Sequence, residues 1–144
     1  MLIGIPPVLG PELLATLRAM GHGDEIALVD GNYPALSHAR RLIRADGHSL
    51  LVMLQAVLQV LPLDTDSPAA IFRASQNNDP MQSAPIHHRI EAVCATLKPG
   101  FAVQPLAGAE LYPRISAAHA VIATGERALY ANVILRKGVI GEGP

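Results

Sequence analysis

The positions of hydrophobic and polar residues along this chain predict helices and strands in alternation. Residues 10–20 carry an apolar stripe at helical spacing, with Pro11 at a favourable first position and Gly21 as its end. A second helix is predicted over residues 49–60, a nearly continuous apolar run for which Ser49 provides an N-cap. The remaining predictions are helices at 86–97 and at 112–119, the latter beginning at Pro113, strands at 25–30, 42–47, 68–74, 101–106, 120–125 and 130–138, and polar loops at 31–41 and 75–85.

This alternation is typical of a layered α/β fold. The chain has 144 residues, a length that fits one domain with a sizeable core. Neither an internal repeat nor a wide linker divides it. We therefore expect residues 1–144 to form a single domain.

The composition narrows the classes of function. Half of the residues are hydrophobic, only 3% are aromatic and 16% are charged, and the net charge is −1. A chain of this kind is not disordered, and its near-neutral balance gives no reason to expect a nucleic-acid partner. Sparse charge beside a high apolar content favours self-association of the folded chain.

No segment predicts a membrane protein. The longest apolar stretch, residues 50–63, is interrupted by Gln55 and Gln59 and is too short to span a bilayer. The N-terminus lacks the pattern of a secretory signal, so we expect a cytoplasmic protein. Cys94 is the single cysteine and stands at an apolar helical position, which predicts a small core residue.

His22 is the first candidate for chemistry, because it stands between Gly21 and Gly23 where a predicted helix ends and a strand begins. The glycines give the backbone freedom and leave room for a ligand, but a histidine at a helix C-terminus also favours the helix dipole alone. Asp30 ends the strand, and ligands of open α/β sheets collect beyond the carboxyl ends of strands. An Asx turn in "DGN" is the alternative for Asp30.

Three further polar residues stand near predicted element boundaries. Tyr112 and Tyr130 are two of the three tyrosines, and the alternative for both is a residue at the edge of the core. Asn132 alternates with Tyr130, which predicts that both side chains share one face of a strand. No metal site is predicted, because the other histidines lack metal-ligand spacing and are expected on the surface: His38, His48, His87, His88 and His119.

Several stretches together resemble a known family. "PELLATLRAMGHGDEIALVD", "IRADG", "LPLD" and "ATGERALYANVILRKGV" are similar to the sugar mutarotases, the family that contains L-fucose mutarotase and D-ribose pyranase. The resemblance runs from about residue 5 to residue 139 and is weak between residues 75 and 107. The first half is closer to the fucose branch, whereas the "YAN" triplet is closer to the ribose branch.

The resemblance implies a three-layer α/β/α fold with a mixed central sheet and a cofactor-independent isomerase acting on a monosaccharide. It implies His22 as the catalytic proton-transfer residue. It also implies homo-oligomers with sites at subunit interfaces. The residues implied to bind the sugar are Asp30, Tyr130 and Asn132, together with Asp64 and Tyr112, which match positions used in the fucose branch.

The residue types suit exchange of anomers through ring opening, in which a proton reaches the ring oxygen and another leaves the anomeric hydroxyl. A histidine gains and loses a proton near neutral pH, and we expect the strand that follows His22 to deliver Asp30 beside it. Gly108 stands near the place of a family arginine or histidine, which predicts an unfilled gap. The alternatives are a non-catalytic sugar-binding or transport-accessory protein and an enzyme that interconverts pyranose and furanose forms.

Overall fold

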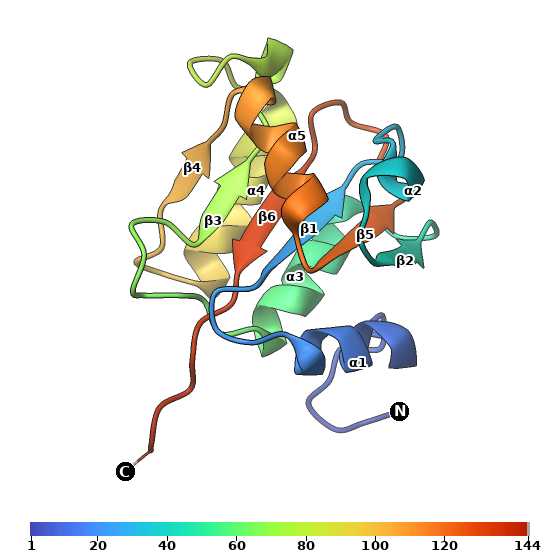
Figure 1. The fold of residues 1–144 in the computed structure, drawn as a ribbon, viewed down its shortest axis with the longest axis vertical. Helices are drawn as coiled ribbons and strands as arrows, with labels where there is room; N and C mark the ends of the chain where they lie inside the picture. Colours follow the sequence, from blue (N-terminus) through green and yellow to red (C-terminus); the bar gives the residue numbers. More distant parts are fainter. Residues whose placement is uncertain (144) are drawn as a thin grey trace.

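Six strands form one sheet at the centre of the computed structural model, which describes residues 1–143 (Figure 1). The strands are β1 (Glu25–Val29), β2 (Leu42–Ala45), β3 (Ile71–Arg73), β4 (Val103–Pro105), β5 (Ala120–Thr124) and β6 (Val133–Arg136), in the order β2-β5-β1-β6-β3-β4. β5 runs parallel to β1 and β2, and β4 runs parallel to β3. β6 is antiparallel to both of its neighbours, so the mixed sheet implied by the resemblance is confirmed.

Helices cover both faces of this sheet (Figure 1). They are α1 (Pro11–Ala19), α2 (Ala35–His38), α3 (Leu50–Val60), α4 (Pro85–Leu97) and α5 (Gly108–Ala117), with a short 3₁₀ turn at Gln76–Asn78. α1, α3 and α4 share one core cluster with Ile26 and Leu28, whereas α2 and α5 share another with Ala27 and Val29. Successive side chains of β1 point to opposite faces and so reach both clusters. The predicted three-layer α/β/α fold is confirmed.

Two local predictions are confirmed by side-chain detail. Ser49 caps α3, since its hydroxyl accepts a hydrogen bond from the backbone N–H of Val52 at 3.3 Å. Cys94 is fully buried in the core, as its apolar helical position predicts.

The start of α5 differs from the prediction. The helix begins at Gly108 and contains Pro113 in its interior, where a proline removes one backbone hydrogen bond. Leu111 and Ile115, one turn apart and both buried against the sheet, draw the earlier residues into the helix. Tertiary packing therefore overrides the local preference of Pro113.

None of the helices within residues 1–143 is long and apolar enough to cross a membrane. The longest, α4, has 13 residues, against the roughly 20 that a bilayer requires.

Candidate active site

His22 lies in a tight loop between α1 and β1. Gly23 has a positive φ of 85°, a conformation in which a side chain is strained, and its N–H donates to the carbonyl of Lys137 at 2.8 Å. Across the loop, the carboxylate of Asp24 accepts from the N–H of Gly21 at 2.7 Å. The glycines on either side of His22 therefore serve the turn, and the imidazole is left 42% exposed.

The imidazole rests on a buried carboxylate. Nε2 of His22 lies 3.0 Å from Oδ1 of Asp64 and 3.5 Å from Oδ2 of Asp66. Asp64 is only 3% exposed, and it also accepts hydrogen bonds from the Ser67 hydroxyl at 2.7 Å and from Nε of Arg136 at 2.8 Å. We call these residues, His22, Asp64, Asp66 and Arg136, the His22 cluster.

Hydrogen bonds to the ionised form hold the pKa of Asp64 well below its usual range; the largest contribution is from the Ser67 hydroxyl, followed by the Asp66 N–H, His22 and Arg136. With Asp64 ionised, Nε2 of His22 is the donor to this carboxylate, and in the neutral form of the ring Nδ1 presents a lone pair. This is the arrangement of a histidine base oriented by a carboxylate. Asp64, rather than Asp30, is the carboxylate that orients His22.

His22, Asp64 and Asp66 also carry the potential metal-ligand atoms that lie within 4.8 Å of one another in residues 1–143. The guanidinium of Arg136 already neutralises Asp64 from the side opposite His22. A cation would have to compete with that arginine, so the arrangement suits proton transfer better than metal binding.

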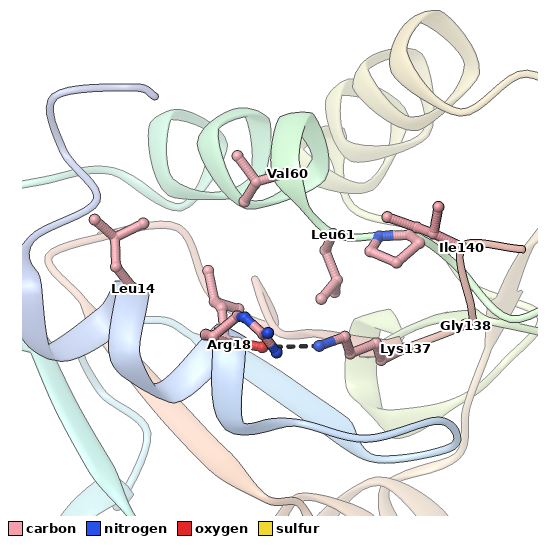
Figure 2. A pocket seen from close by; sticks show the side chains of 9 residues that line it. Leu14, Arg18, Val60, Leu61, Lys137, Gly138 and Ile140 are labelled. Carbon is pink, nitrogen blue, oxygen red and sulfur yellow. Dashed lines mark hydrogen bonds between the residues drawn. The ribbon is translucent and has the colours of Figure 1, made fainter. Parts of the chain in front are cut away.

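Lys137 links the His22 loop to the end of α1. Its ammonium donates to the carbonyls of Leu17 and Met20 at the end of α1, at 3.0 and 2.6 Å, and its backbone bonds to Gly23 and Asp24. Figure 2 shows this lysine on the wall of a cavity of about 370 Å³ between α1, the end of α3 and the segment after β6. The lining of this cavity is largely aliphatic and contains none of the predicted site residues, so we assign the cavity a structural role.

A second cluster lies at the other end of β1 and is centred on Asp30, which is 6% exposed. Its Oδ1 accepts from the N–H of Asn32 at 2.9 Å, which makes the Asx turn considered as the alternative, while Oδ2 accepts from the N–H of Ala131 at 3.3 Å. The N–H of Asp30 donates to Oδ1 of Asn132 at 3.0 Å. Burial raises the pKa of Asp30, against the lowering effect of the N–H donors.

The segment before β6 departs from the predicted strand. β6 begins only at Val133, and Tyr130 has a positive φ of 58°, so Tyr130 and Asn132 do not alternate along a strand as expected. Asn132 is instead placed by its bond to Asp30. The Tyr130 hydroxyl lies 3.5 Å from Oδ1 of Asn77, which brings the 75–85 loop to this cluster.

Aromatic rings flank the same region. Tyr112, on α5 and 42% exposed, stacks on Tyr33 at 5.5 Å between ring centroids, and His38 meets both rings edge-on. Burial raises the pKa of Tyr33 to about 12, so its phenol stays protonated, and its hydroxyl lies within hydrogen-bond distance of Nδ1 of His38, at 2.8 Å. The N–H of Tyr33 donates to the carbonyl of Asp30 at 3.3 Å. We call Asp30, Tyr112, Tyr130 and Asn132 the Asp30 cluster.

The sequence did not predict a role for Tyr33 and placed His38 among scattered surface histidines, because no local pattern shows that α2 and α5 bring these rings together.

The gap predicted at Gly108 is absent. A Cβ at Gly108 would lie 2.8 Å from Oδ1 and Cγ of Asn78, so the Asn78 side chain fills that space.

The two clusters lie at opposite ends of one extended strand (Figure 1). A strand rises about 3.3 Å per residue, so the five residues of β1 separate them by about 17 Å. The expectation that β1 delivers Asp30 beside His22 is therefore wrong within one chain. Both halves carry the polar groups of a ligand site, but no monosaccharide is wide enough to touch both.

Comparisons with known proteins agree with this architecture. A sequence model of the RbsD / FucU transport protein family matches residues 3–140. Fucose mutarotase of Mus musculus is 44% identical over 147 residues, covering 98% of this chain and 96% of that protein. The structure of the fucose mutarotase from Streptococcus pneumoniae in complex with L-fucose gives a TM-score of 0.81 at 38% identity, covering 97% of this chain and 100% of the other. Bacillus subtilis RbsD complexed with D-ribose shares the fold, with a TM-score of 0.73 at 21% identity over 92% of this chain and 95% of that one.

Proposed function

Because this chain belongs to the RbsD / FucU transport protein family, we propose that it is an isomerase that interconverts the anomers of L-fucose. The observation that carries the proposal is the exposed imidazole of His22 held on the buried, ionised carboxylate of Asp64. The relatives named fucose mutarotase, and the relative whose structure contains L-fucose, support the choice of sugar.

The reaction opens and recloses the C1–O5 bond, with two proton transfers in each direction. As the C1–O5 bond of the pyranose opens, the anomeric hydroxyl loses its proton, C1 becomes an aldehyde carbon and O5 gains a proton. Rotation about C1–C2 followed by closure on the other face reverses both transfers and yields the other anomer. His22 exchanges the proton through Nδ1 while Asp64 fixes its orientation, and a positioned acid–base group typically contributes about 10²–10⁴-fold to the rate.

The Asp30 cluster binds the remaining sugar hydroxyls. Asp30 and Asn132 offer acceptors and donors, and Tyr130 and Tyr112 offer phenol groups, with the Tyr112 ring partly exposed. Aromatic faces also suit the apolar side of a 6-deoxy sugar.

We further propose that a complete site forms between two copies of the chain. The His22 cluster of one subunit faces the Asp30 cluster of the next, since β1 separates the two clusters within one chain. The closed homo-oligomer and the cytoplasmic location expected from the sequence stay predictions.

Saturation-transfer NMR on L-fucose tests the function directly. The wild-type protein is expected to accelerate exchange between the α and β signals, and His22→Asn to lose about 10²-fold or more of that acceleration while keeping its fold. His48→Asn, at an exposed histidine, is the matched control. Binding of L-fucose without faster exchange would instead support the sugar-binding alternative.

A further inference from the structure

The sequence places His87 among the surface histidines, and this expectation is wrong. His87 is the third residue of α4 and is fully buried, whereas its neighbour His88 is exposed. The proposed reaction does not use this ring. A buried imidazole needs partners for both nitrogens, and those partners show what it does.

The hydrogen bonds of His87 define one tautomer. Nδ1 accepts from the backbone N–H of Ala84 at 2.9 Å, so the ring proton lies on Nε2, which donates to the carbonyl of Tyr130 at 2.8 Å. Burial lowers the pKa of His87, with Arg73 and His88 adding to the lowering and the Tyr130 carbonyl and Glu91 opposing it. The ring therefore stays neutral and acts as acceptor and donor at once.

The second of these bonds reaches the Asp30 cluster through a single peptide unit. The carbonyl of Tyr130 binds His87, and the N–H of the same peptide, which belongs to Ala131, donates to Oδ2 of Asp30 at 3.3 Å. The peptide follows a residue with a φ of 58°, a conformation that is costly for a bulky residue such as tyrosine. His87 and Asp30 thus hold the two ends of one peptide plane.

We propose that His87 is a positioning residue that fixes the Tyr130–Ala131 peptide plane and thereby the binding geometry of Tyr130 and Asp30. This role rests on the proposed function, since those two residues are the sugar ligands of the Asp30 cluster. It concerns affinity rather than proton transfer, because His22 lies in the other cluster.

Two substitutions separate the bonds of His87. The amide of His87→Gln reaches the position of Nε2 and retains a donor for the Tyr130 carbonyl but loses the acceptor for Ala84. His87→Asn retains an acceptor near Nδ1 for Ala84 but cannot reach Tyr130. The same two changes at exposed His88 are the matched controls.

We expect His87→Asn to raise the KM for L-fucose about tenfold with kcat within about twofold of wild type, and His87→Gln to restore most of the affinity. Amide hydrogen exchange of Ala131 should accelerate in His87→Asn only. Equal loss in both variants, tracking their stability, would overturn the proposal and leave His87 a core residue. A wild type that fails to bind L-fucose would instead refute the proposed function, and the exchange of Ala131 would still decide the role of His87.

If neither variant folds, ¹⁵N NMR of the wild-type imidazole decides. The proposal requires the Nε2–H tautomer of His87 to persist as pH falls through the range in which an unperturbed histidine titrates, about pH 6.5. A ring protonated on Nδ1 in that range would contradict it, since that proton would face the N–H of Ala84.

Discussion

The two buried carboxylates of the site, Asp64 and Asp30, have pKa values shifted in opposite directions. Asp64 is held by the Ser67 hydroxyl, His22 and Arg136, all of which favour the ionised form. Burial dominates at Asp30, whose donors are backbone N–H groups of its own turn and of Ala131. One end of β1 is thus built around a permanent negative charge that orients a base, and the other around a buried carboxylate that orders a loop.

Under the proposed function, this difference gives a reason for proton transfer at one end of β1 and sugar binding at the other. A proton-transfer histidine needs a strong, fixed charge beside it, and such a charge would cost free energy at the Asp30 cluster, where the carboxylate is buried and has no cationic partner among its hydrogen bonds within residues 1–143. Side chains from the α1–β1 loop, the loop after α3 and the end of β6 meet at the His22 cluster. The proposed interface between two copies would bring the charged half and the binding half together.

Mixing two inactive variants gives the largest expected effect. His22→Asn and Asp30→Asn each disable a different half, so neither should accelerate L-fucose exchange alone. After co-expression or joint refolding, random assembly leaves about a quarter of the interface sites with both native residues. We expect activity to return to about that fraction, measured by saturation-transfer NMR.

The control is a mixture of each variant with the doubly substituted chain, which restores no site in which His22 and Asp30 belong to different subunits and are both native. No recovery in the first mixture, despite co-purification of differently tagged subunits that shows mixed oligomers, would place both residues of a site in one subunit. A monomer that retains activity would refute the interface altogether.

Asp64→Asn tests the charged half. The amide cannot supply the negative charge that orients His22, and its NH₂ group opposes Arg136 or His22, so we expect kcat for L-fucose exchange to fall about 10²-fold. Asp66→Asn, at a carboxylate that is 73% exposed, is the matched control and should cost far less. Equal losses in the two variants would show that kcat depends on the total negative charge near His22 rather than on the buried His22–Asp64 hydrogen bond.

The lowered pKa of Asp64 also predicts that the stability of the fold depends on pH. The folded pKa of Asp64 lies below its unfolded value, so the unfolded chain binds the proton more readily. Its stabilising contribution is complete above about pH 4 and is lost as pH falls further toward the folded pKa. Melting temperatures measured from pH 6 to pH 2 should therefore fall more steeply for wild type than for Asp64→Asn; parallel curves would contradict this.

The sequence predicted much of the fold, because its signals are local, and it named His22 and Asp64 as site residues, whose roles stay predictions. Helical spacing, the Ser49 cap and the alternation of elements are all visible within short windows. What escaped prediction depends on contacts between distant segments. His87 and Tyr130 are 43 positions apart in the sequence, and Asp64 and Arg136 are 72 positions apart. No local pattern predicts contacts between residues so far apart.

The separation of His22 from Asp30 was also missed, although it follows from the predicted strand itself. Residues on either side of one extended strand cannot be neighbours, because the five residues of β1 alone separate them by about 17 Å. His22 and Asp30 were expected side by side because both residues match the site of the same family. The resemblance names the residues, and the geometry of β1 is the reason for proposing that two chains supply them.

Lys137→Met tests how firmly the charged half must be held. The ammonium bonds to the Leu17 and Met20 carbonyls at the end of α1 would be lost, while the methylene stem stays in the apolar cavity of Figure 2. Charged hydrogen bonds of this kind contribute about 1.5–3 kcal/mol, so we expect a similar drop in the free energy of unfolding.

We also expect kcat to fall about fivefold to tenfold as the His22 loop loosens, with KM little changed because the Asp30 cluster is intact. Urea denaturation and NMR exchange rates measure the two effects. Lys98→Met at the end of α4 is the matched control and should spare kcat. A change confined to KM would link Lys137 to sugar binding instead.

The smallest effect concerns the binding half, at the contact between Gly108 and Asn78. Gly108→Ala places a Cβ 2.8 Å from the Asn78 amide, and overpacking of this kind costs about 1–3 kcal/mol of stability, toward the lower end here because Asn78 is a surface-loop residue. Asn78 has a φ of 60°, which glycine adopts freely, so Asn78→Gly should rescue Gly108→Ala without straining the loop. Gly47→Ala, where a Cβ meets nothing within 4 Å, is the control. Chemical denaturation of the two single variants and the double variant measures the coupling between the sites. Additive losses of stability in the double variant would mean that Asn78 does not fill the space beside Gly108. The unfilled gap expected from the sequence would then be present.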